Sequence, residues 1–427
     1  MKPLVDLIAR HKAGEAVGLY SVCSAHPLVL EAALRVAKRE STYALIEATS
    51  NQVNQDGGYT GMRPTDFVRF VRAIATRVEL PQERVLLGGD HLGPNCWQQL
   101  SAEQAMLRSE RLIEDYVAAG FRKIHLDCSM ACADDRAPLG DAIVAARVAR
   151  LCQVAERTWQ RVGGEAPVYV VGTEVPVPGG AHESLSELHP TEPAAAAATI
   201  EAHLTAFALV KLDTVWPRVI GLVVQPGVEF DHHKVIDFHS ERIAGLTTLI
   251  EGEPHMVYEA HSTDYQTPPN LRELVRQHFA LLKVGPALTF ALREALWALA
   301  LIEREWLPPD GCSGLRQTVM DAMAADPRHW EKYYPSTGAR RLLDQQFSLS
   351  DRVRYYWPVP AVEQAVNRLL ANLKHDPPPL TLLSQFMPQQ YAAVRAGTLG
   401  QEARELALHH VELVLQQYAC ACGGGLA

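Results

Sequence analysis

Val85-Leu86-Leu87-Gly88-Gly89-Asp90-His91 is a short apolar run that ends abruptly in an acid and a histidine. A strand that is apolar along its whole length is covered on both faces, as strands are in parallel sheets. Seven more runs share this pattern of an apolar stretch followed by polar, acidic or histidine residues: 18–24, 44–49, 123–129, 168–174, 220–226, 257–262 and 281–286. Polar residues at the C-terminal ends of such strands lie at the active-site mouth of a (β/α)8 barrel. The sequence therefore predicts an α/β fold, an eight-stranded TIM barrel with a functional site.

Helix-length amphipathic stretches separate these runs, so strand and helix alternate over residues 15–305. Pro308-Pro309-Asp310-Gly311 ends the alternation, and no further run with the pattern of a buried strand follows it. Beyond residue 315 the pattern predicts helices separated by turns, including 361–373, 380–395 and 401–418. We therefore predict a TIM barrel over residues 1–305 and a helical C-terminal extension over residues 306–427 that packs on the barrel.

An aromatic and basic segment lies inside the predicted extension, Asp351-Arg352-Val353-Arg354-Tyr355-Tyr356-Trp357-Pro358. Tyr, Trp and Arg dominate the energetics of protein interfaces, so the segment fits a surface for a partner. It also fits the docking of the extension onto the barrel, and the sequence favours docking.

The composition excludes several classes of protein. The chain has 427 residues, of which 48% are hydrophobic, and a formal net charge of −9. Its charges are spread rather than blocked, so there is no basic footprint for nucleic acid. No charge-free apolar run approaches the roughly 18 residues of a membrane helix, and residues 1–6 lack the layout of a signal peptide. Eight cysteines in so long a chain do not indicate a disulfide framework. We expect a soluble cytoplasmic protein.

Polar residues at the predicted strand ends form one constellation, because consecutive barrel strands place their ends around a ring. The ring comprises Glu47, Asp90, His91, Asp127, Glu174, Gln225, Glu259, His261 and Lys283. Imidazoles and carboxylates together suit a divalent cation, zinc or a similar metal. We predict metal ligation by His91, Glu174 and His261. We assign proton transfer to three carboxylates of the ring, Glu47, Asp90 and Asp127.

The loop 172–180 after the fifth predicted strand contains Gly179 and Gly180. Glycines let backbone N–H groups approach an anion, and TIM barrels often bind phosphate with such loops. An ordinary turn is the alternative. Together with Ser262 and Lys283, these glycines form the predicted set that binds a sugar phosphate. The amide-rich loop 51–61 is expected to face the substrate. No Gly-x-Gly-x-x-Gly fingerprint is present, so no nucleotide cofactor is expected.

Several of these segments are similar to the GatZ/KbaZ family, and they span nearly the whole chain: 21–27, 46–53, 88–95, 172–180, 224–230, 259–265, 283–289 and 354–358. Cys128 and the stretch 181–188 resemble the KbaZ branch more closely. The resemblance implies the Z subunit of D-tagatose-1,6-bisphosphate aldolase. That subunit is regarded as non-catalytic and supports the activity and stability of a separate class II aldolase, the Y subunit. Some relatives are instead reported as ketohexose-phosphate 4-epimerases.

The family resemblance also implies a ligand pattern. A class II aldolase barrel has three histidine ligands at strand ends, with an acid beside the first. Here Asp90-His91 resembles the first ligand with its acid, and His261 resembles the last. The middle position falls in 224–227, where no histidine stands. His232 and His233 lie a few residues further on, and Glu174 is a possible substitute.

Two functions follow, and the sequence favours the first. One is an accessory subunit of the aldolase in tagatose 6-phosphate, galactitol or N-acetylgalactosamine catabolism, contacting the Y subunit through the helical extension. The other is a metal-dependent 4-epimerase that converts tagatose 6-phosphate to fructose 6-phosphate. In that reaction a cation would polarise the C2 ketone, and a carboxylate such as Asp90 or Asp127 would move the C4 hydroxyl proton.

Overall fold

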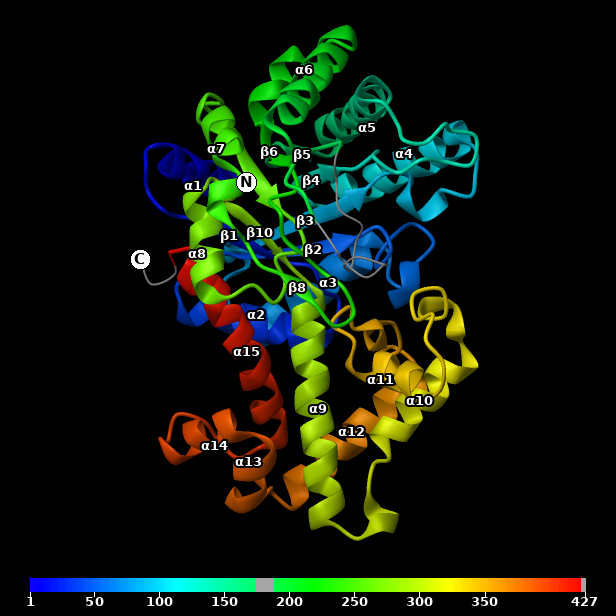
Figure 1. Cartoon of the computed structure of the whole chain (residues 1–427), viewed down its shortest axis with the longest axis vertical. Coiled ribbons are helices and arrows are strands. Elements are labelled where there is room, and N and C mark those ends of the chain that lie inside the picture. Colours follow the sequence, from blue (N-terminus) through cyan, green and yellow to red (C-terminus); the bar gives the residue numbers. More distant parts are fainter. Residues whose placement is uncertain (174–187, 424–427) are drawn as a thin grey trace.

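A computed structural model describes residues 1–173 and 188–423 of the chain (Figure 1). Eight parallel strands close into a barrel in the order β1-β10-β9-β6-β5-β4-β3-β2. The strands are β1 Leu19–Val22, β2 Ala44–Thr49, β3 Val85–Leu92, β4 Lys123–Leu126, β5 Val168–Val171, β6 Val219–Val223, β9 Val257–Ala260 and β10 Leu281–Val284. Each overlaps one of the eight apolar runs, so the predicted TIM barrel is confirmed.

A helix follows each barrel strand, and these helices cover the outside of the barrel (Figure 1). They are α2 Pro27–Arg39, α3 Pro64–Arg77, α4 Ala102–Ala119, α5 Asp141–Val162, α6 Pro193–Leu209, α7 Ala244–Glu251, α8 Pro268–Arg276 and α9 Pro286–Trp306. Five of them begin with proline, which fits a first turn because its missing N–H would have no helical partner there. Between β6 and α7 the chain adds a small antiparallel hairpin, β7 Glu229–Phe230 and β8 Val235–Ile236.

The N-terminal end of the barrel is closed by α1, which covers Lys2–Lys12. Met1, Leu4 and Ile8 belong to one apolar cluster with the first inward-facing residues of the strands. Those strand residues include Leu19, Leu45, Leu86, Val168, Ile220, Val257 and Leu281. Helix α1 therefore seals the end of the barrel opposite the predicted site.

The helices after the barrel are α10 Leu315–Ala325, α11 Gly338–Phe347, α12 Pro360–His375, α13 Leu380–Phe386, α14 Pro388–Arg395 and α15 Ala403–Ala421. The predicted helix 380–395 is two helices, because Pro388 has no N–H to continue the ladder of α13. Helix α15 returns to the barrel and packs against α2, α8 and α9 (Figure 1). At its end the N–H of Gly18 donates to the carbonyl of Cys422 at 3.1 Å.

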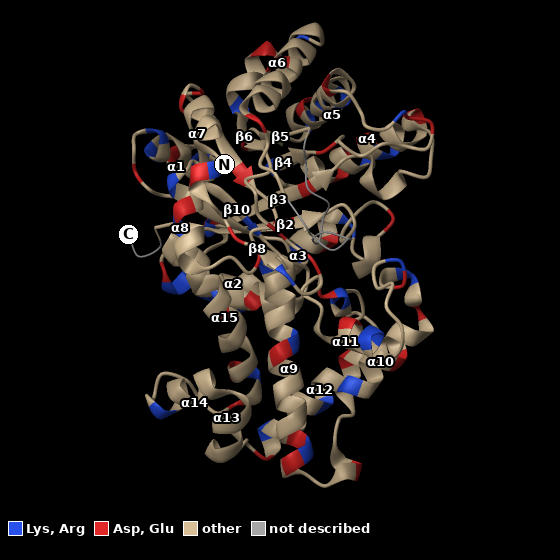
Figure 2. Ribbon diagram, in the orientation of Figure 1, with Lys and Arg blue, Asp and Glu red and all other residues tan. Residues whose placement is uncertain are grey.

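The division of the chain at residue 305 stays a prediction, since α9 runs through that position to Trp306. Both signs of charge are interspersed along the outer helices rather than gathered on separate faces (Figure 2). Within residues 1–173 and 188–423, no helix has the length and apolar character needed to cross a membrane.

Candidate metal centre

A cavity opens at the C-terminal end of the barrel. It is lined by the ends of β1, β2, β3, β9 and β10, by the loop after β2, and by Arg354 and Tyr355 of the C-terminal extension. This is the end that carries the active site in TIM-barrel enzymes. The extension therefore contributes part of the wall of the site.

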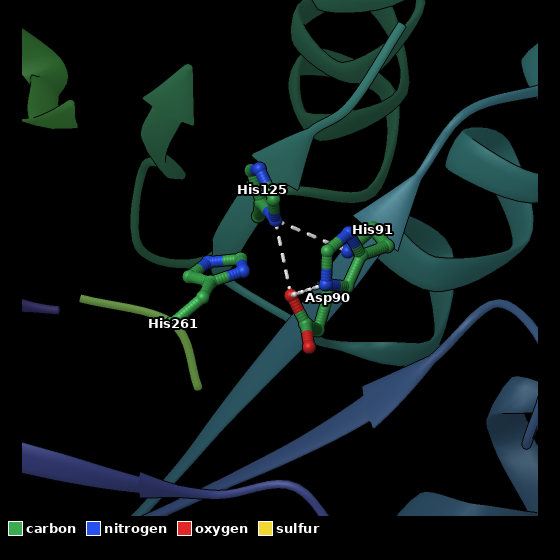
Figure 3. Close-up of side chains that lie close together, drawn as sticks. All are labelled: Asp90, His91, His125 and His261. Carbon is green, nitrogen blue, oxygen red and sulfur yellow. Dashed lines mark hydrogen bonds and ion pairs between the residues drawn. The ribbon is translucent and has the colours of Figure 1, made fainter. Parts of the chain in front are cut away.

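Four side chains at the base of this cavity converge on one point: Asp90, His91, His125 and His261. Each offers one ligand atom, and these atoms lie within 4.8 Å of one another. The three imidazole rings are 4.9 to 5.1 Å apart between centroids and surround the Asp90 carboxylate (Figure 3). Asp90 Oδ1 lies 3.0 Å from His125 Nδ1 and 3.7 Å from His91 Nε2. We call this group the histidine cluster.

The end of β3 is bent so that two consecutive residues both face the cavity. In a regular strand, Asp90 and His91 would point to opposite sides. His91 instead has a φ of 48°, in the left-handed region that is costly for a residue with a side chain. The register between β3 and β4 also shifts between Gly89 and Leu92. This irregularity allows one strand to supply both an acid and an imidazole.

Two of the imidazoles have a carboxylate at their second nitrogen. His91 Nδ1 lies 2.8 Å from Asp127 Oδ2, and His261 Nε2 lies 3.0 Å from Glu259 Oε1. Such partners fix the ring and the tautomer of metal-binding histidines. The Nε2 atom of His125 is buried and has no hydrogen-bond partner among the described residues. Three imidazoles, two of them held in this way and with the Asp90 carboxylate beside them, fit a zinc-like divalent cation.

Two of the three histidines are neutral without any bound metal. Burial lowers the pKa of His125 and lowers the pKa of His261 to about 3, so both rings are neutral, as ligation requires. Burial acts in the same direction on His91, but the charges of Asp90 and Asp127 raise its pKa above the ordinary value. A bound cation would stand among these same carboxylates and would favour the neutral ring.

Beneath the histidine cluster lies a layer of buried charges. Lys123 Nζ lies 2.6 Å from Glu47 Oε1 and 2.5 Å from Glu259 Oε2. Lys283 Nζ lies 2.6 Å from Glu47 Oε2 and also pairs with Asp90. Buried charges are tolerated when they are paired in this way. The layer holds Asp90 directly and, through Glu259, the ring of His261.

Glycine at position 88 makes room for this layer. A Cβ atom there would stand 2.8 Å from Cγ of Glu47, the residue beside it on β2. The space at Gly88 therefore lets the Glu47 carboxylate reach both lysines.

The three predicted catalytic carboxylates lie at different depths. Asp90 lines the cavity. Glu47 is fully buried in the charge layer below it. Asp127 stands behind His91 and accepts a hydrogen bond from Ser129 Oγ at 2.6 Å. Of the three, only Asp90 is placed to meet a substrate, and the assigned roles stay predictions.

The predicted ligand-binding residues are only partly described. His91, His261, Ser262 and Lys283 line the cavity. The predicted metal ligand Glu174 and the predicted phosphate-binding residues Gly179 and Gly180 lie outside the described residues. The roles of all of them stay predictions.

His125, which supplies the third imidazole, was not among the site residues predicted from the sequence. A signal for it exists, because Lys123 and His125 of β4 and Asp127 just beyond it are two residues apart and so face the same side. The position expected for a middle histidine, 224–227, contributes no histidine. Its Gln225 side chain accepts hydrogen bonds from the backbone of Gly227 and Val228, which shapes the turn after β6.

His232 and His233 also lie outside the histidine cluster. They contact Ser348 and Asp344 of the extension, at 3.1 Å and 2.8 Å. They therefore belong to the packing between the β7–β8 hairpin and the extension.

Residues 4–423 match the family described as D-tagatose-1,6-bisphosphate aldolase subunit GatZ/KbaZ-like. A crystal structure of a probable tagatose 6 phosphate kinase from Sinorhizobium meliloti 1021 is 48% identical to the chain. It superimposes with a TM-score of 0.88 over 95% of this chain and 100% of that one.

Two further structures are each 12% identical to the chain. Fructuronate-tagaturonate epimerase UxaE from Cohnella laeviribosi has a TM-score of 0.47, over 94% of this chain and 82% of that one. The YdjI aldolase from Escherichia coli K12 has a TM-score of 0.40, over 86% of this chain and 94% of that one. Similarities of this size carry no functional argument. The match over residues 4–423 is decisive, and the chain belongs to the GatZ/KbaZ-like family.

Proposed function

We propose that this chain is a metal-dependent 4-epimerase that interconverts tagatose 6-phosphate and fructose 6-phosphate. The observation that carries the proposal is the histidine cluster, with Asp90 among its rings, at the mouth of the barrel. In the sequence, the resemblance implies a non-catalytic subunit, and the missing middle histidine fits a loss of aldolase activity. His125 weakens the second of these grounds, because it brings a third imidazole to His91 and His261.

His91, His125 and His261 would hold the cation. A bound divalent cation supplies Lewis-acid polarisation of the C2 ketone. Asp90 accepts the C4 hydroxyl proton while the C3–C4 bond breaks, which leaves an aldehyde at C4 and a three-carbon enediolate. The aldehyde presents its other face, the C3–C4 bond forms again, and Asp90 returns the proton to the same C4 oxygen. Atoms and electrons balance, and no hydride carrier is needed.

The surrounding residues position these groups rather than react. Asp127 fixes the ring of His91, and Glu259 fixes the ring of His261. Lys283 pairs with the Asp90 carboxylate and keeps it directed into the cavity. The side chains of Asp90 and His261 are each less than 5% exposed, so the reacting groups are shielded from bulk water.

The test is direct. The purified chain is incubated with tagatose 6-phosphate and zinc, nickel or manganese, and fructose 6-phosphate is measured by NMR. We expect conversion with at least one metal and none after chelation. Asp90→Asn should keep the fold and the three histidines but lose conversion. Absence of product from a chain that carries a full complement of metal would contradict the epimerase.

A second candidate is an accessory subunit of class II D-tagatose-1,6-bisphosphate aldolase, which the word subunit in the family's description favours. Helix α11 exposes Leu342, Leu343 and Phe347, each between 42% and 52%, which suits contact with a catalytic Y subunit. Co-purification with that aldolase and a longer aldolase half-life would support this function. An unchanged half-life with and without the chain would count against it.

A further inference from the structure

We propose that Arg354, carried by the C-terminal extension, binds the phosphate group of the sugar phosphate in the barrel cavity. The inference rests on the proposed function in that it assumes a phosphorylated substrate. It adds a residue from outside the barrel strands to the recognition of that substrate. Arg354 and its neighbour Tyr355 line the same cavity as Asp90, His91 and His261.

Arg354 forms no ion pair with a described residue, and the acids Asp351 and Asp264 act on its charge only from beyond ion-pair distance. No carboxylate of the described residues lies within ion-pair distance of its guanidinium. Lys283, which also lines the cavity, contacts Glu47, Asp90 and Glu259, so its charge is compensated inside the barrel. Among the lysines and arginines of the described wall, an incoming phosphate therefore meets Arg354 as the one that no ion pair engages.

The guanidinium also keeps free donors on one edge. Its Nη1 donates to the carbonyls of Ser350 and Asp351, and its Nη2 donates to Tyr355 Oη at 3.2 Å. Arginine has five N–H donors, and no hydrogen bond to the described residues uses Nε. Nε and Nη2 lie on one edge of the guanidinium, and such an edge can bind phosphate in a bidentate manner.

The usual phosphate site of this fold is already taken. In TIM barrels, phosphate often binds near the last strands at a helix N-terminus. Here the N-terminus of α9 is occupied by the Asp264 carboxylate, which accepts hydrogen bonds from the backbone of Gly285 and Ala287 at 3.0 and 2.8 Å. A second anion at that position would be repelled by Asp264, which favours a phosphate partner elsewhere in the cavity.

Arg354 is held rigidly in the wall. Asp351 adopts a φ of 41° and lies 3.5 Å from Arg293 of α9, and both side chains are at most 2% exposed. Since α9 directly follows β10, this buried pair ties the segment to the barrel. On the cavity side, Tyr355 contacts Tyr59 of the loop after β2, with ring centroids 4.7 Å apart. The arginine is thus presented in a fixed geometry, as recognition of a small ligand requires.

The test measures binding as well as turnover. Calorimetry compares fructose 6-phosphate, fructose and inorganic phosphate as ligands of the metal-loaded chain. Wild type should bind fructose 6-phosphate more tightly than fructose. Arg354→Gln should weaken the binding of fructose 6-phosphate roughly 10- to 100-fold, which is the effect of a lost charged hydrogen bond. The affinity for fructose should stay unchanged. Where conversion is measured, KM should rise while kcat changes little.

Two further variants make the result specific. Arg354→Lys keeps the positive charge but loses the pair of N–H donors on one edge. Its affinity for fructose 6-phosphate should therefore lie between those of wild type and Arg354→Gln. Arg328→Gln removes an arginine of the extension that pairs with Asp326 and should bind like wild type. Metal content and thermal midpoint confirm that each variant is folded.

The outcomes separate this inference from the proposed function. If Arg354→Gln loses the preference for fructose 6-phosphate over fructose, Arg354 binds the phosphate group, even if the chain converts no substrate. An unchanged preference for fructose 6-phosphate over fructose in Arg354→Gln overturns it, whether or not the chain is an epimerase. If wild type itself shows no such preference, the inference is also overturned.

Discussion

The two ends of the barrel are built from the same strands, yet one end is apolar and the other is charged. At the N-terminal end, Leu45 of β2 and Leu281 of β10 pack against α1. Two residues further along the same strands stand Glu47 and Lys283, which form an ion pair. A step of two residues keeps a side chain inside the barrel but moves it by about 6–7 Å along the strand. Depth along each strand therefore separates the residues that stabilise the fold from those that bind and react.

The difference between the two ends makes distinct predictions. Substitutions in the apolar end should change stability and leave metal binding intact. Substitutions in the histidine cluster should do the reverse. The charge layer lies between them and should affect both.

The largest change in stability is expected for Lys123→Met. Removing this buried ammonium leaves the carboxylates of Glu47 and Glu259 without one of their partners, which should cost about 3–5 kcal/mol in the free energy of unfolding. Urea denaturation followed by circular dichroism measures it. Lys38→Met, which removes an exposed lysine paired with Glu79, should cost less than about 1 kcal/mol. Equal costs for the two variants would mean that the charge layer does not stabilise the barrel.

A smaller change is expected at the apolar end. Leu4 of α1 is 1% exposed, and Leu4→Ala should lower the free energy of unfolding by about 2–4 kcal/mol. Its metal content should equal that of wild type, because the cluster lies at the other end. The neighbouring Val5 is 43% exposed, so Val5→Ala is the control and should be nearly neutral. A loss of metal in Leu4→Ala would show that the two ends are not independent.

The smallest effect concerns neither end but the attachment of the C-terminal helix α15 to the outside of the barrel. Glu31 of α2 is buried among Arg35, Arg77 and Arg404. Burial alone would raise the pKa of Glu31, but the hydrogen bonds and charges of Arg404, Arg77 and Arg35 lower it to about 2. A folded pKa below the ordinary value of 4.5 stabilises the fold above pH 4.5, and this stabilisation is lost as the pH falls toward 2.

Glu31→Gln should therefore cost roughly 2 kcal/mol at pH 7 and progressively less below pH 4.5. Denaturation at several pH values measures this. The exposed Glu79, changed to glutamine, provides a baseline with little dependence on pH. A cost for Glu31→Gln that stays constant from pH 7 to pH 3 would contradict the account.

Much of the fold could be predicted because barrel strands have a clear local signal. Apolar runs that end in polar residues located all eight strands, each of which overlaps its run. Helix α1 was not predicted, because its role depends on the strand ends that it covers. The single predicted helix over 380–395 overlooked the break at Pro388.

The site was harder to predict, because depth inside a barrel is a property of register. Glu47 and Asp90 both stand near strand ends in the sequence, but the pairing of Glu47 with Gly88 places it one layer below Asp90. His125 was missed because it lies before the polar end of its run. The residue predicted for the site from this run was Asp127, which stands at that end. The contribution of Arg354 depends on how the extension folds back, which no local pattern encodes.

The central claim is that the charged end of the barrel holds a divalent cation between His91, His125 and His261. The most direct measurement is the metal content of wild type, His125→Ala and His232→Ala by mass spectrometry, after loading with zinc and dialysis. His232 is the matched control, since it contacts Ser348 outside the cluster. We expect about one ion per chain in wild type and His232→Ala, and almost none in His125→Ala. A full complement of metal in His125→Ala would contradict it.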